Sequence, residues 1–345
     1  MNNSEGLKQI IATNWQQRGL IAWLLLPPAL LFGLLAAARR LFYRFGVLRS
    51  IRLPVPVIVT GNITAGGSGK TPLVLWLAQR LRECGYRPGI ISRGYGGSAG
   101  GEREVCAGDD AQLVGDEPLL LARRALCPVW IGRDRVVCAQ ALLNAHPECN
   151  VLISDDGLQH YRLARDVEIV VTDERGAGNG WLLPAGPLRE PLSRVRRADA
   201  LVINGGVVPP EFQALRFKPV FEMQLRGTTF TRLDDSTQTC DAGNFTGKRV
   251  HAIAGIGNPG RFFNHLSQLG LRYTAHAFPD HHRYGAADLA FEECDVLLMT
   301  EKDAVKCASF VSDIHCVAWV LRVDAELPSD FAEALLEKLY GPPAA

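Results

Sequence analysis

The sequence lacks the cysteine spacing that would hold a metal ion or a framework of disulfides. Its nine cysteines are scattered through 345 residues and include no Cys-x-x-Cys pair. An odd, dispersed set indicates reduced, mostly buried thiols of a cytosolic protein. The sequence also lacks an excess of charge of one sign, since 37 lysines and arginines face 36 aspartates and glutamates. This balance gives no sign of a nucleic-acid-binding surface.

Internal repeats and low-complexity tracts are absent as well. Hydrophobic residues make up 47% of the chain, which argues against a disordered protein. The length of 345 residues is enough for one large or two medium domains.

Charge is missing altogether from residues 19–38, which are rich in leucine and alanine. This stretch is long enough to span a bilayer, but Pro27 and Pro28 interrupt it, and proline inside a helix removes a hydrogen bond. A signal peptide is excluded because Arg39 and Arg40 follow directly, where small residues would mark a cleavage site. A buried core helix is the less favoured alternative.

A second arrangement for this region is a helix from Pro28 to about Phe45 that lies in the membrane interface. Its polar side would then face lipid headgroups through five arginines: Arg39, Arg40, Arg44, Arg49 and Arg52. Both arrangements predict that residues 1–52 form a membrane-associating segment, with the remainder on the cytoplasmic face.

A phosphate-binding loop is predicted at residues 61–71, between an apolar β-branched run at 55–60 and a helical pattern at 72–81. Glycines let backbone N–H groups surround an anion, and the helix N-terminus adds partial positive charge. Lys70 would reach the β- and γ-phosphates, and the Thr71 hydroxyl would hold Mg²⁺. The loop departs from the common pattern at one position, where Thr64 replaces glycine. The nucleotide-binding candidates are Thr64, Ala65, Gly66, Gly67, Ser68, Gly69, Lys70 and Thr71.

Residues 53–206 alternate between strand and helix patterns, which predicts a P-loop NTPase-type α/β core with a mostly parallel sheet. The helical patterns include 117–126 and 134–145. The expected strands are 55–60, 89–92, 129–131, 151–154, 167–172 and 200–203. Ligands of such sheets collect at the carboxyl ends of the strands, so polar residues at those ends are candidates for the site.

Asp155 follows an apolar strand directly, as the Mg²⁺ partner of a phosphate loop must, and Thr71 would share the ion. Asp156 and Gln159 lie close enough in sequence to join the metal site. At other strand ends, Arg93 and Tyr95 are candidates to face phosphate or substrate, with a solvated turn as the alternative reading.

The proline- and glycine-rich loop 181–190 ends in Arg189 and Glu190, and three further arginines follow at 194, 196 and 197. A basic loop end suits an anionic group on a substrate, so both residues are substrate-binding candidates. An ordinary connecting loop is the alternative.

Beyond residue 206 the composition shifts, and residues 207–328 predict a second, smaller α/β domain followed by a C-terminal helix at 329–345. We expect 221–225 to pair with 230–233, and further strands at 249–254, 272–277, 295–299 and 316–323. Residues 255–260 match a dinucleotide fingerprint, and 300–303 are similar to the guanine-selective loop of GTPases. The second motif has its lysine one position too close to the aspartate, and we predict neither activity.

The general base must be a carboxylate that can reach the acceptor of a phosphoryl group, and Asp116, Asp155 and Asp156 are the candidates. Asp116 either caps a helix or faces the acceptor. Asp155 is assigned to the metal, which leaves Asp116 and Asp156. Asp116 lies at a helix start on the same edge of the sheet, where it could face the acceptor and a histidine from the second domain would orient it. That histidine is His281, with His282 as the alternative partner.

Eight ordered motifs together resemble the tetraacyldisaccharide 4'-kinases, the lipid A 4'-kinases of Gram-negative bacteria. They lie at residues 61–71, 92–96, 115–118, 155–160, 183–190, 255–259, 278–281 and 300–303. The resemblance implies transfer of the γ-phosphate of ATP, with Mg²⁺, to the 4'-hydroxyl of a tetraacylated, 1-phosphorylated glucosamine disaccharide at the inner membrane. The family that the chain resembles tolerates a small hydroxyl residue such as Thr64 in the loop. The resemblance also implies that Asp116 and His281 act together as the general base. No obligate protein partner is inferred.

Two other classes stay open on the sequence. One is a membrane-anchored ATPase or GTPase that uses hydrolysis as a switch, and the other is a non-catalytic nucleotide sensor. A switch hydrolyses ATP without a lipid acceptor, whereas a sensor barely hydrolyses it.

Overall fold

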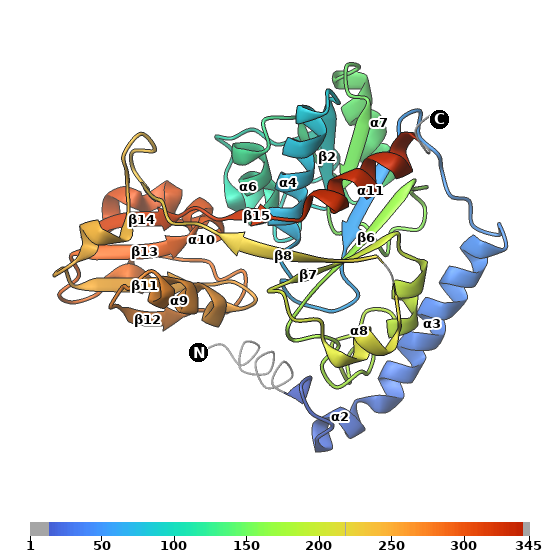
Figure 1. Ribbon diagram of the computed structural model, residues 1–345, viewed down its shortest axis with the longest axis horizontal. Coiled ribbons are helices and arrows are strands. Elements are labelled where there is room, and N and C mark those ends of the chain that lie inside the picture. The colour runs from blue at the N-terminus through green and yellow to red at the C-terminus, as the bar shows by residue number, and fades with distance from the viewer. Residues whose placement is uncertain (1–13, 218, 341–345) are drawn as a thin grey trace.

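The computed structural model describes residues 14–217 and 219–340. Residues 1–13 of the predicted N-terminal segment and residues 341–345 of the predicted C-terminal helix lie outside that part. Two sheets of nine and six strands form two lobes, seen at the right and left of Figure 1.

The nine-stranded sheet is parallel except at its two edge strands. Its order, from edge to edge, is β15 (Asp324–Glu326), β8 (Val220–Arg226), β7 (Ala200–Asn204), β6 (Val167–Asp173), β1 (Val57–Gly61), β5 (Val151–Ser154), β2 (Pro88–Ser92), β4 (Val129–Ile131) and β3 (Arg103–Glu104). The predicted mostly parallel sheet is confirmed. Because both faces are covered, the central strands are buried along their whole length and read as continuous apolar runs.

Alternate residues of each strand enter different cores. Ile58 packs on one face with helices α4 (Lys70–Glu83), α6 (Asp116–Arg124) and α11 (Ser329–Tyr340), whereas Val57 and Val59 pack on the other with α7 (Arg135–Ala145) and α8 (Pro210–Ala214). Short helical turns connect the remaining elements of this lobe: α5 (Ala111–Val114) and η1 (Leu192–Arg197).

The six-stranded sheet has the order β10 (Thr239–Cys240), β9 (Phe230–Arg232), β14 (Val317–Leu321), β13 (Val296–Thr300), β11 (Val250–Ala254) and β12 (Thr274–Ala277). Its last four strands are parallel, and they have cores of their own. The helical elements of this lobe are η2 (Ala242–Phe245), α9 (Pro259–Gln268), η3 (Ala286–Leu289), α10 (Glu301–Cys307) and η4 (Ala308–Asp313).

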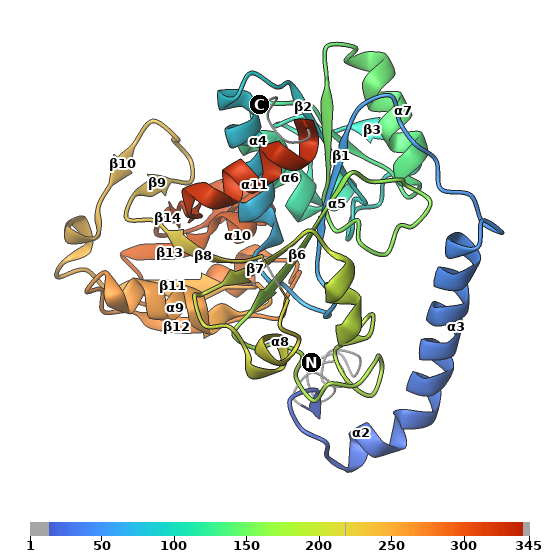
Figure 2. The ribbon, with the colours of Figure 1, turned by 45° about the vertical axis from the view of Figure 1, so that its right-hand side comes forward.

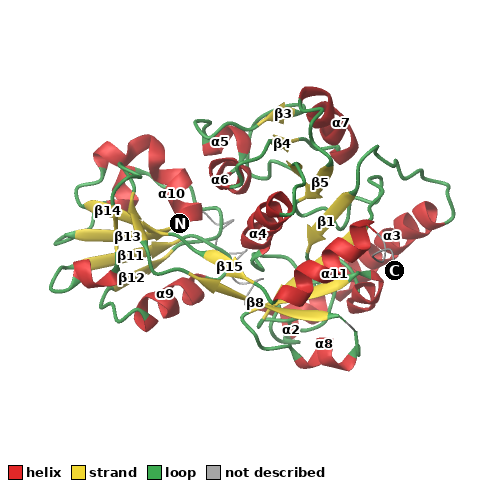
Figure 3. Ribbon diagram, turned by 45° about the horizontal axis from the view of Figure 1, so that its top comes forward, coloured by secondary structure: helices red, strands yellow, loops and turns green. Residues whose placement is uncertain are grey.

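The expected pairing of strands 221–225 and 230–233 is wrong. Strand β8 lies beside β7 in the nine-stranded sheet, and β9 pairs with β14 and β10 in the other. The reason is burial, because Phe221 and Met223 belong to the core of the nine-stranded sheet. Strand β15 then returns antiparallel to β8, and Figure 3 shows the two strands side by side between the lobes.

Because β8 and β15 both belong to the nine-stranded sheet, the boundaries of the small domain differ from the expected 207–328. We propose that the small domain is residues 227–323, which lie between the end of β8 and the start of β15. We call the remainder, without the N-terminal helices, the large domain. Helix α11 packs on it through Phe331, whose ring centroid lies 4.8 Å from that of Phe221.

The charge-free stretch folds as two helices, α2 (Leu20–Leu24) and α3 (Leu26–Arg44), rather than as one. Pro27 and Pro28 fall in the first turn of α3, where a missing N–H group breaks no helical hydrogen bond. Helix α3 extends along the outer edge of the large domain (Figure 2). Four of its leucines expose 59–67% of their surface: Leu30, Leu31, Leu34 and Leu35.

Candidate active site

The loop between β1 and α4 has the backbone of a phosphate cradle. Gly69, immediately before the helix, has φ of 91°, and a Cβ atom there would lie 2.1 Å from Asn204 Nδ2. Only glycine fits, because the Asn204 side chain donates a hydrogen bond to the Ser68 carbonyl at 3.1 Å. Lys70 and Thr71 then open α4, and the Lys70 side chain is only 8% exposed.

Asp155 at the end of β5 lies at the same edge of the sheet, buried beneath the loop. One carboxylate oxygen accepts a hydrogen bond from the Ser92 hydroxyl at 3.3 Å, but the other, although buried, has no hydrogen-bond partner in the described structure. Burial, reinforced by the Glu117 carboxylate, raises the pKa of Asp155 to about 7. A buried carboxylate oxygen without a partner is what a divalent cation requires, so Asp155 fits the predicted Mg²⁺ site.

Asp156 follows in the left-handed conformation, with φ of 47°, and is held by two cations. It accepts hydrogen bonds from Arg189 Nη1 at 2.9 and 3.2 Å, and Lys70 Nζ lies 3.6 Å away. Burial opposes ionisation, but these charges outweigh it and lower the pKa of Asp156 to about 2. Asp156 thereby links the phosphate-loop lysine to the loop at 183–190.

Glu190 is enclosed rather than open to a ligand, with 2% of its surface exposed. The Tyr161 hydroxyl donates to it in a close hydrogen bond, Gln159 Nε2 donates at 3.3 Å, and Arg40 of α3 donates at 3.3 Å. Gln159 also donates to the Asn62 carbonyl at 3.2 Å. Glu190 therefore ties α3 to the catalytic edge of the sheet.

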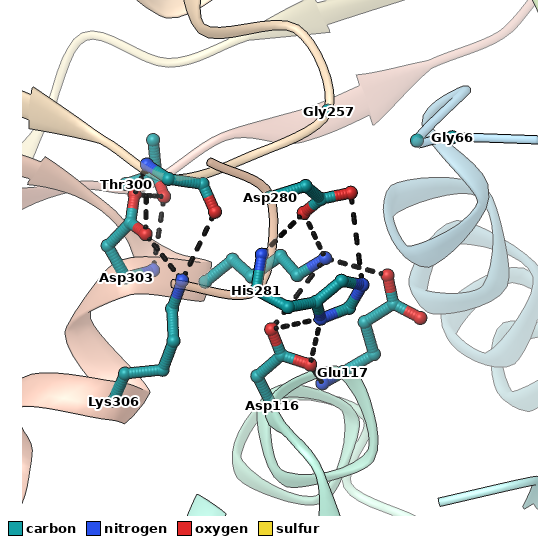
Figure 4. Close-up of polar contacts among 12 residues, drawn as sticks. Gly66, Asp116, Glu117, Gly257, Asp280, His281, Thr300, Asp303 and Lys306 are labelled. Atoms are coloured by element: carbon teal, nitrogen blue, oxygen red, sulfur yellow. Dashed lines mark hydrogen bonds and ion pairs between the residues drawn. The ribbon is translucent and has the colours of Figure 1, made fainter. Parts of the chain in front are cut away.

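Asp116 and His281 meet although 165 residues separate them. Asp116 opens α6 of the large domain, and His281 lies in the loop after β12 of the small domain, with its Nδ1 atom 3.0 and 3.2 Å from the two carboxylate oxygens. Figure 4 shows the imidazole between Asp116 and Asp280, whose nearest oxygen is 3.8 Å from Nε2. The alternative partner His282 instead contacts Asp288 at 3.2 Å.

The charges of this pair depend on each other. Burial would raise the pKa of Asp116, but the hydrogen bond from His281 and the charge of Lys302 outweigh it and lower that pKa to about 2. Burial would lower the pKa of His281, and the hydrogen bond to Asp116 reverses this and raises it. Asp116 is therefore ionised at neutral pH and accepts a hydrogen bond from the ring.

A cleft of about 680 Å³ brings most of the predicted residues together. Its lining combines the phosphate loop with residues from strand ends, the loop at 183–190, the small domain and α3. Predicted residues in it are Ala65, Gly66, Gly67, Lys70, Arg93, Tyr95, Asp155, Asp156, Gln159, Arg189, Glu190 and His281. Thr64, Ser68, Gly69 and Thr71 lie in the same loop outside this lining, and Asp116 lies behind His281, in a small adjoining pocket.

Sequence reasoning missed the contribution of α3, which lines the cleft with Phe32, Leu35, Ala36 and Arg39. Arg39 and Arg40, which we expected to face lipid headgroups, instead line the cleft and bind Glu190, respectively. The local sequence does not show which side of a helix packs on the rest of the chain. Sequence reasoning also missed Arg175, which contacts the carbonyls of Gly67 and Gly257 and so joins the two domains at the phosphate loop.

A phosphate loop, two strand-end aspartates and His281 line one cleft, and Asp116 contacts His281 from behind. This arrangement defines a P-loop nucleotide-dependent phosphotransferase. Residues 21–340 match the family model described as tetraacyldisaccharide-1-P 4'-kinase. The chain belongs to this family, and it is an ATP-dependent kinase of lipid A biosynthesis.

Individual relatives agree over the whole chain. A tetraacyldisaccharide 4'-kinase of Azoarcus sp. (strain BH72) is 54% identical over 100% of both chains. One of Dechloromonas aromatica (strain RCB) is 55% identical over 92% of this chain and 93% of its own. The solved LpxK structure from Aquifex aeolicus, in complex with ATP, is 30% identical with a TM-score of 0.77, covering 93% of this chain and all of that one.

Proposed function

We propose that the 680 Å³ cleft transfers the γ-phosphate of ATP to the 4'-hydroxyl of a tetraacylated glucosamine disaccharide 1-phosphate. The product would be the 4'-phosphorylated lipid A precursor. The observation that carries the proposal is that the phosphate loop and His281, which is hydrogen-bonded to Asp116 behind it, line one cleft, and α3 lines the same cleft with apolar side chains. Such a wall suits an acceptor with acyl chains.

The nucleotide phosphates would be held by the backbone N–H groups of residues 64–71 and by the Lys70 ammonium. Asp156 and Arg189 keep this lysine directed along the loop through the contacts at 3.6 and 2.9 Å. The lysine charge would act most strongly as charge moves onto the β–γ bridge oxygen in the transition state.

Thr71 and Asp155 would hold Mg²⁺, with Asp156 and Gln159 adjacent. The ion would supply charge neutralisation between the phosphates. In support, Asp155 has a buried oxygen without a partner. Asp155→Asn should then raise the Mg²⁺ concentration needed for half-maximal activity, and a Mg²⁺ titration that overlays wild type would refute the assignment.

The acceptor would be placed between α3 and the strand ends, with Arg93, Tyr95 and Arg189 near its polar groups. Glu190 would shape this wall through Arg40 and Gln159, because its own carboxylate is enclosed. Asp116 and His281 would together receive the proton of the attacking hydroxyl, with His281 on the cleft side.

We further propose that the catalytic body lies on the cytoplasmic face of the inner membrane, where ATP is available. Among the described residues, α3 is the one helix with the length and composition of a membrane span, and 6% of its apolar window is buried inside the protein. Membrane lipids would cover its exposed leucines.

A double-mutant cycle tests the acid–histidine pair. Asp116→Ala should lose most of kcat with little change in the KM for ATP, since nucleotide binding does not need the base. His281→Ala should lose less, and the double variant should be little worse than Asp116→Ala. Fully multiplicative losses would show that the residues act independently. ATP hydrolysis at full rate without a lipid acceptor would favour the switch function instead.

A further inference from the structure

Lys302 occupies the seam between the two domains, where it faces three carboxylates. It lies in the first turn of α10 in the small domain. Its Nζ atom is 3.0 Å from Glu117 Oε1, 3.2 Å from Asp280 Oδ1 and 3.7 Å from Asp116 Oδ2. Glu117 and Asp116 belong to the large domain, so two of these three contacts exist only while the domains are together.

Three carboxylate groups converge on this one ammonium, and like charges so close together repel one another. The two lysines of α10 have different partners. Lys306, one turn further along α10, contacts Asp303 at 2.8 Å and the Gly255 carbonyl at 3.1 Å, both in the small domain. Lys302 is thus the cation of this helix that reaches across to Asp116.

The start of α10 is fixed so that Lys302 points across the seam. The Thr300 hydroxyl accepts a hydrogen bond from the Asp303 N–H at 3.2 Å, as a helix cap does. The Asp303 carboxylate is fully buried and accepts hydrogen bonds from the Gly255 N–H and the Tyr284 hydroxyl. Since Tyr284 follows His281 by three residues, its hydrogen bond to Asp303 ties the His281 loop to α10.

Glu301, the neighbour of Lys302, makes a second contact between the domains at a distance from the site. Its carboxylate accepts a hydrogen bond from Arg124 Nη1 at 2.6 Å. Arg124 also donates to the Val323 carbonyl, beside β15, at 3.3 Å. This ion pair crosses the same seam without touching Asp116 or His281.

We propose that Lys302 is a positioning residue for phosphoryl transfer, which places Asp116 against His281 when the small domain closes on the large one. Its ammonium neutralises the repulsion that Asp280 and Glu117 would exert on Asp116. Burial opposes the charge of Lys302, but the nearby carboxylates of Glu117, Asp116 and Asp280 outweigh it and raise the pKa of Lys302. The proposal rests on the proposed role of the Asp116–His281 pair.

The test compares Lys302→Met with Arg124→Met in the full-length protein, assayed with ATP and the disaccharide lipid. Lys302→Met should lower kcat on the order of 10-fold to 100-fold, part of the contribution of a general base, and leave the KM for ATP within about threefold. Lys302→Arg, which keeps the charge, should recover most of kcat. Arg124→Met, the matched seam control, should retain kcat to within about threefold.

A cycle with Asp116→Asn separates positioning from a purely structural role. If Lys302 acts through the pair, Lys302→Met should cost nothing further in the Asp116→Asn background. An equal loss in both backgrounds, or an equal kcat loss in Arg124→Met, would overturn the proposal. Should Lys302→Met fail to fold, as judged by its melting temperature, Lys302→Gln takes its place in the same cycle.

The same variants distinguish the role of the Asp116–His281 pair from the role of Lys302. If Asp116→Asn loses kcat while Lys302→Met does not, the pair stands and the role of Lys302 is wrong. If Asp116→Asn itself keeps wild-type kcat, the proposed role of the pair is wrong, and the role of Lys302 falls with it.

Discussion

At the scale of single residues, the site depends on charges placed where solvent is scarce. Lys70 is 8% exposed, and the partners of Asp116 and Asp156 reverse the effect of burial on both carboxyl groups. The two carboxyl groups are therefore kept ionised by their neighbours, and removing a neighbour changes the chemistry of those that remain.

Lys70→Ala should lower kcat on the order of 10² or more, because a charge that stabilises the transition state is lost. The fold should survive, since the glycine turn and α4 do not depend on the ammonium. Initial rates with saturating ATP and acceptor test this. The control is Arg80→Ala, about three turns further along α4, whose side chain is 42% exposed. Near-wild-type kcat in a folded Lys70→Ala protein would refute the assignment of the loop.

The Asp116–His281 pair should stabilise the closed protein most between about pH 4 and 6.5. The pKa of Asp116 is lowered to about 2, so its contribution is complete above the unfolded value near 4 and is lost as the pH falls toward 2. The pKa of His281 is raised, so its contribution is complete below about 6.5 and is lost as the pH rises through the raised value.

Melting temperatures of wild type and His281→Gln, measured from pH 5 to pH 9, test that window. The difference should be largest at the acidic end and shrink toward pH 9. A difference that grows with pH would contradict the raised pKa. His265→Gln is the control, because its ring bonds the Gly227 carbonyl at 2.6 Å and faces no carboxylate in the described contacts.

At the scale of elements, the two sides of α3 have different surroundings. Phe32, Leu35, Ala36 and Arg39 line the cleft, and Arg40 binds Glu190, whereas Leu30 and Leu34 point away with 65% and 67% of their surface exposed. Residues four positions apart share a helix face, so these two leucines form one apolar stripe.

The double variant Leu30→Glu/Leu34→Glu should release the protein from phospholipid vesicles. Burying a leucine contributes roughly 1.5–3 kcal/mol, so losing two should lower partitioning on the order of 10² or more. Vesicle sedimentation measures it. The control is Leu126→Glu/Val207→Glu on the body of the protein, at positions 75% and 67% exposed. Equal release by both double variants would show that α3 is not the membrane contact.

Most strands could be predicted from sequence, because a parallel sheet covered on both faces produces short, continuous apolar runs. Strands β4 and β5 occur at the predicted residues. The apolar runs did not show which strands pair with β8 and β9. Neighbouring strands usually pair, and only the burial of Phe221 in a distant core shows that these two do not.

The residues of the site likewise fall into those with a local sequence signal and those without one. The phosphate loop and Asp155 were predictable because strand, turn and helix signals are local. Asp116 and His281 carry no local signal for each other, and the pairing came from candidate carboxylates together with family resemblance. Lys302 and α3 were missed as parts of the site, because only the folded arrangement of segments far apart in the sequence brings them to it.

At the scale of the whole molecule, the two domains meet at two glycines, Gly67 and Gly257. A Cβ atom on Gly257 of the small domain would lie 2.6 Å from the Gly67 N–H nitrogen in the phosphate loop. Arg175 bridges the same two residues through their carbonyls. The small domain therefore approaches the nucleotide loop backbone to backbone at these two residues, and the Arg175 side chain bridges their carbonyls.

Gly257→Ala should hinder this approach and lower kcat about 10-fold or more, because a gap at the seam misplaces His281. Small-angle scattering should report a larger radius of gyration, while the small domain remains folded. Gly260→Ala is the matched control, since its nearest neighbour would be 3.6 Å away within the same domain. Unchanged kcat and radius in Gly257→Ala would show that closure tolerates a methyl group there.

The antiparallel return of β15 beside β8 also has a consequence for biosynthesis. All residues of the small domain are contiguous, so it can fold once residue 323 has left the ribosome. The large sheet is different, because its edge strand β15 and the covering helix α11 follow the small domain in the chain. Until they emerge, the core around Phe221 stays open to solvent on one side, and a nascent chain would depend on chaperones there.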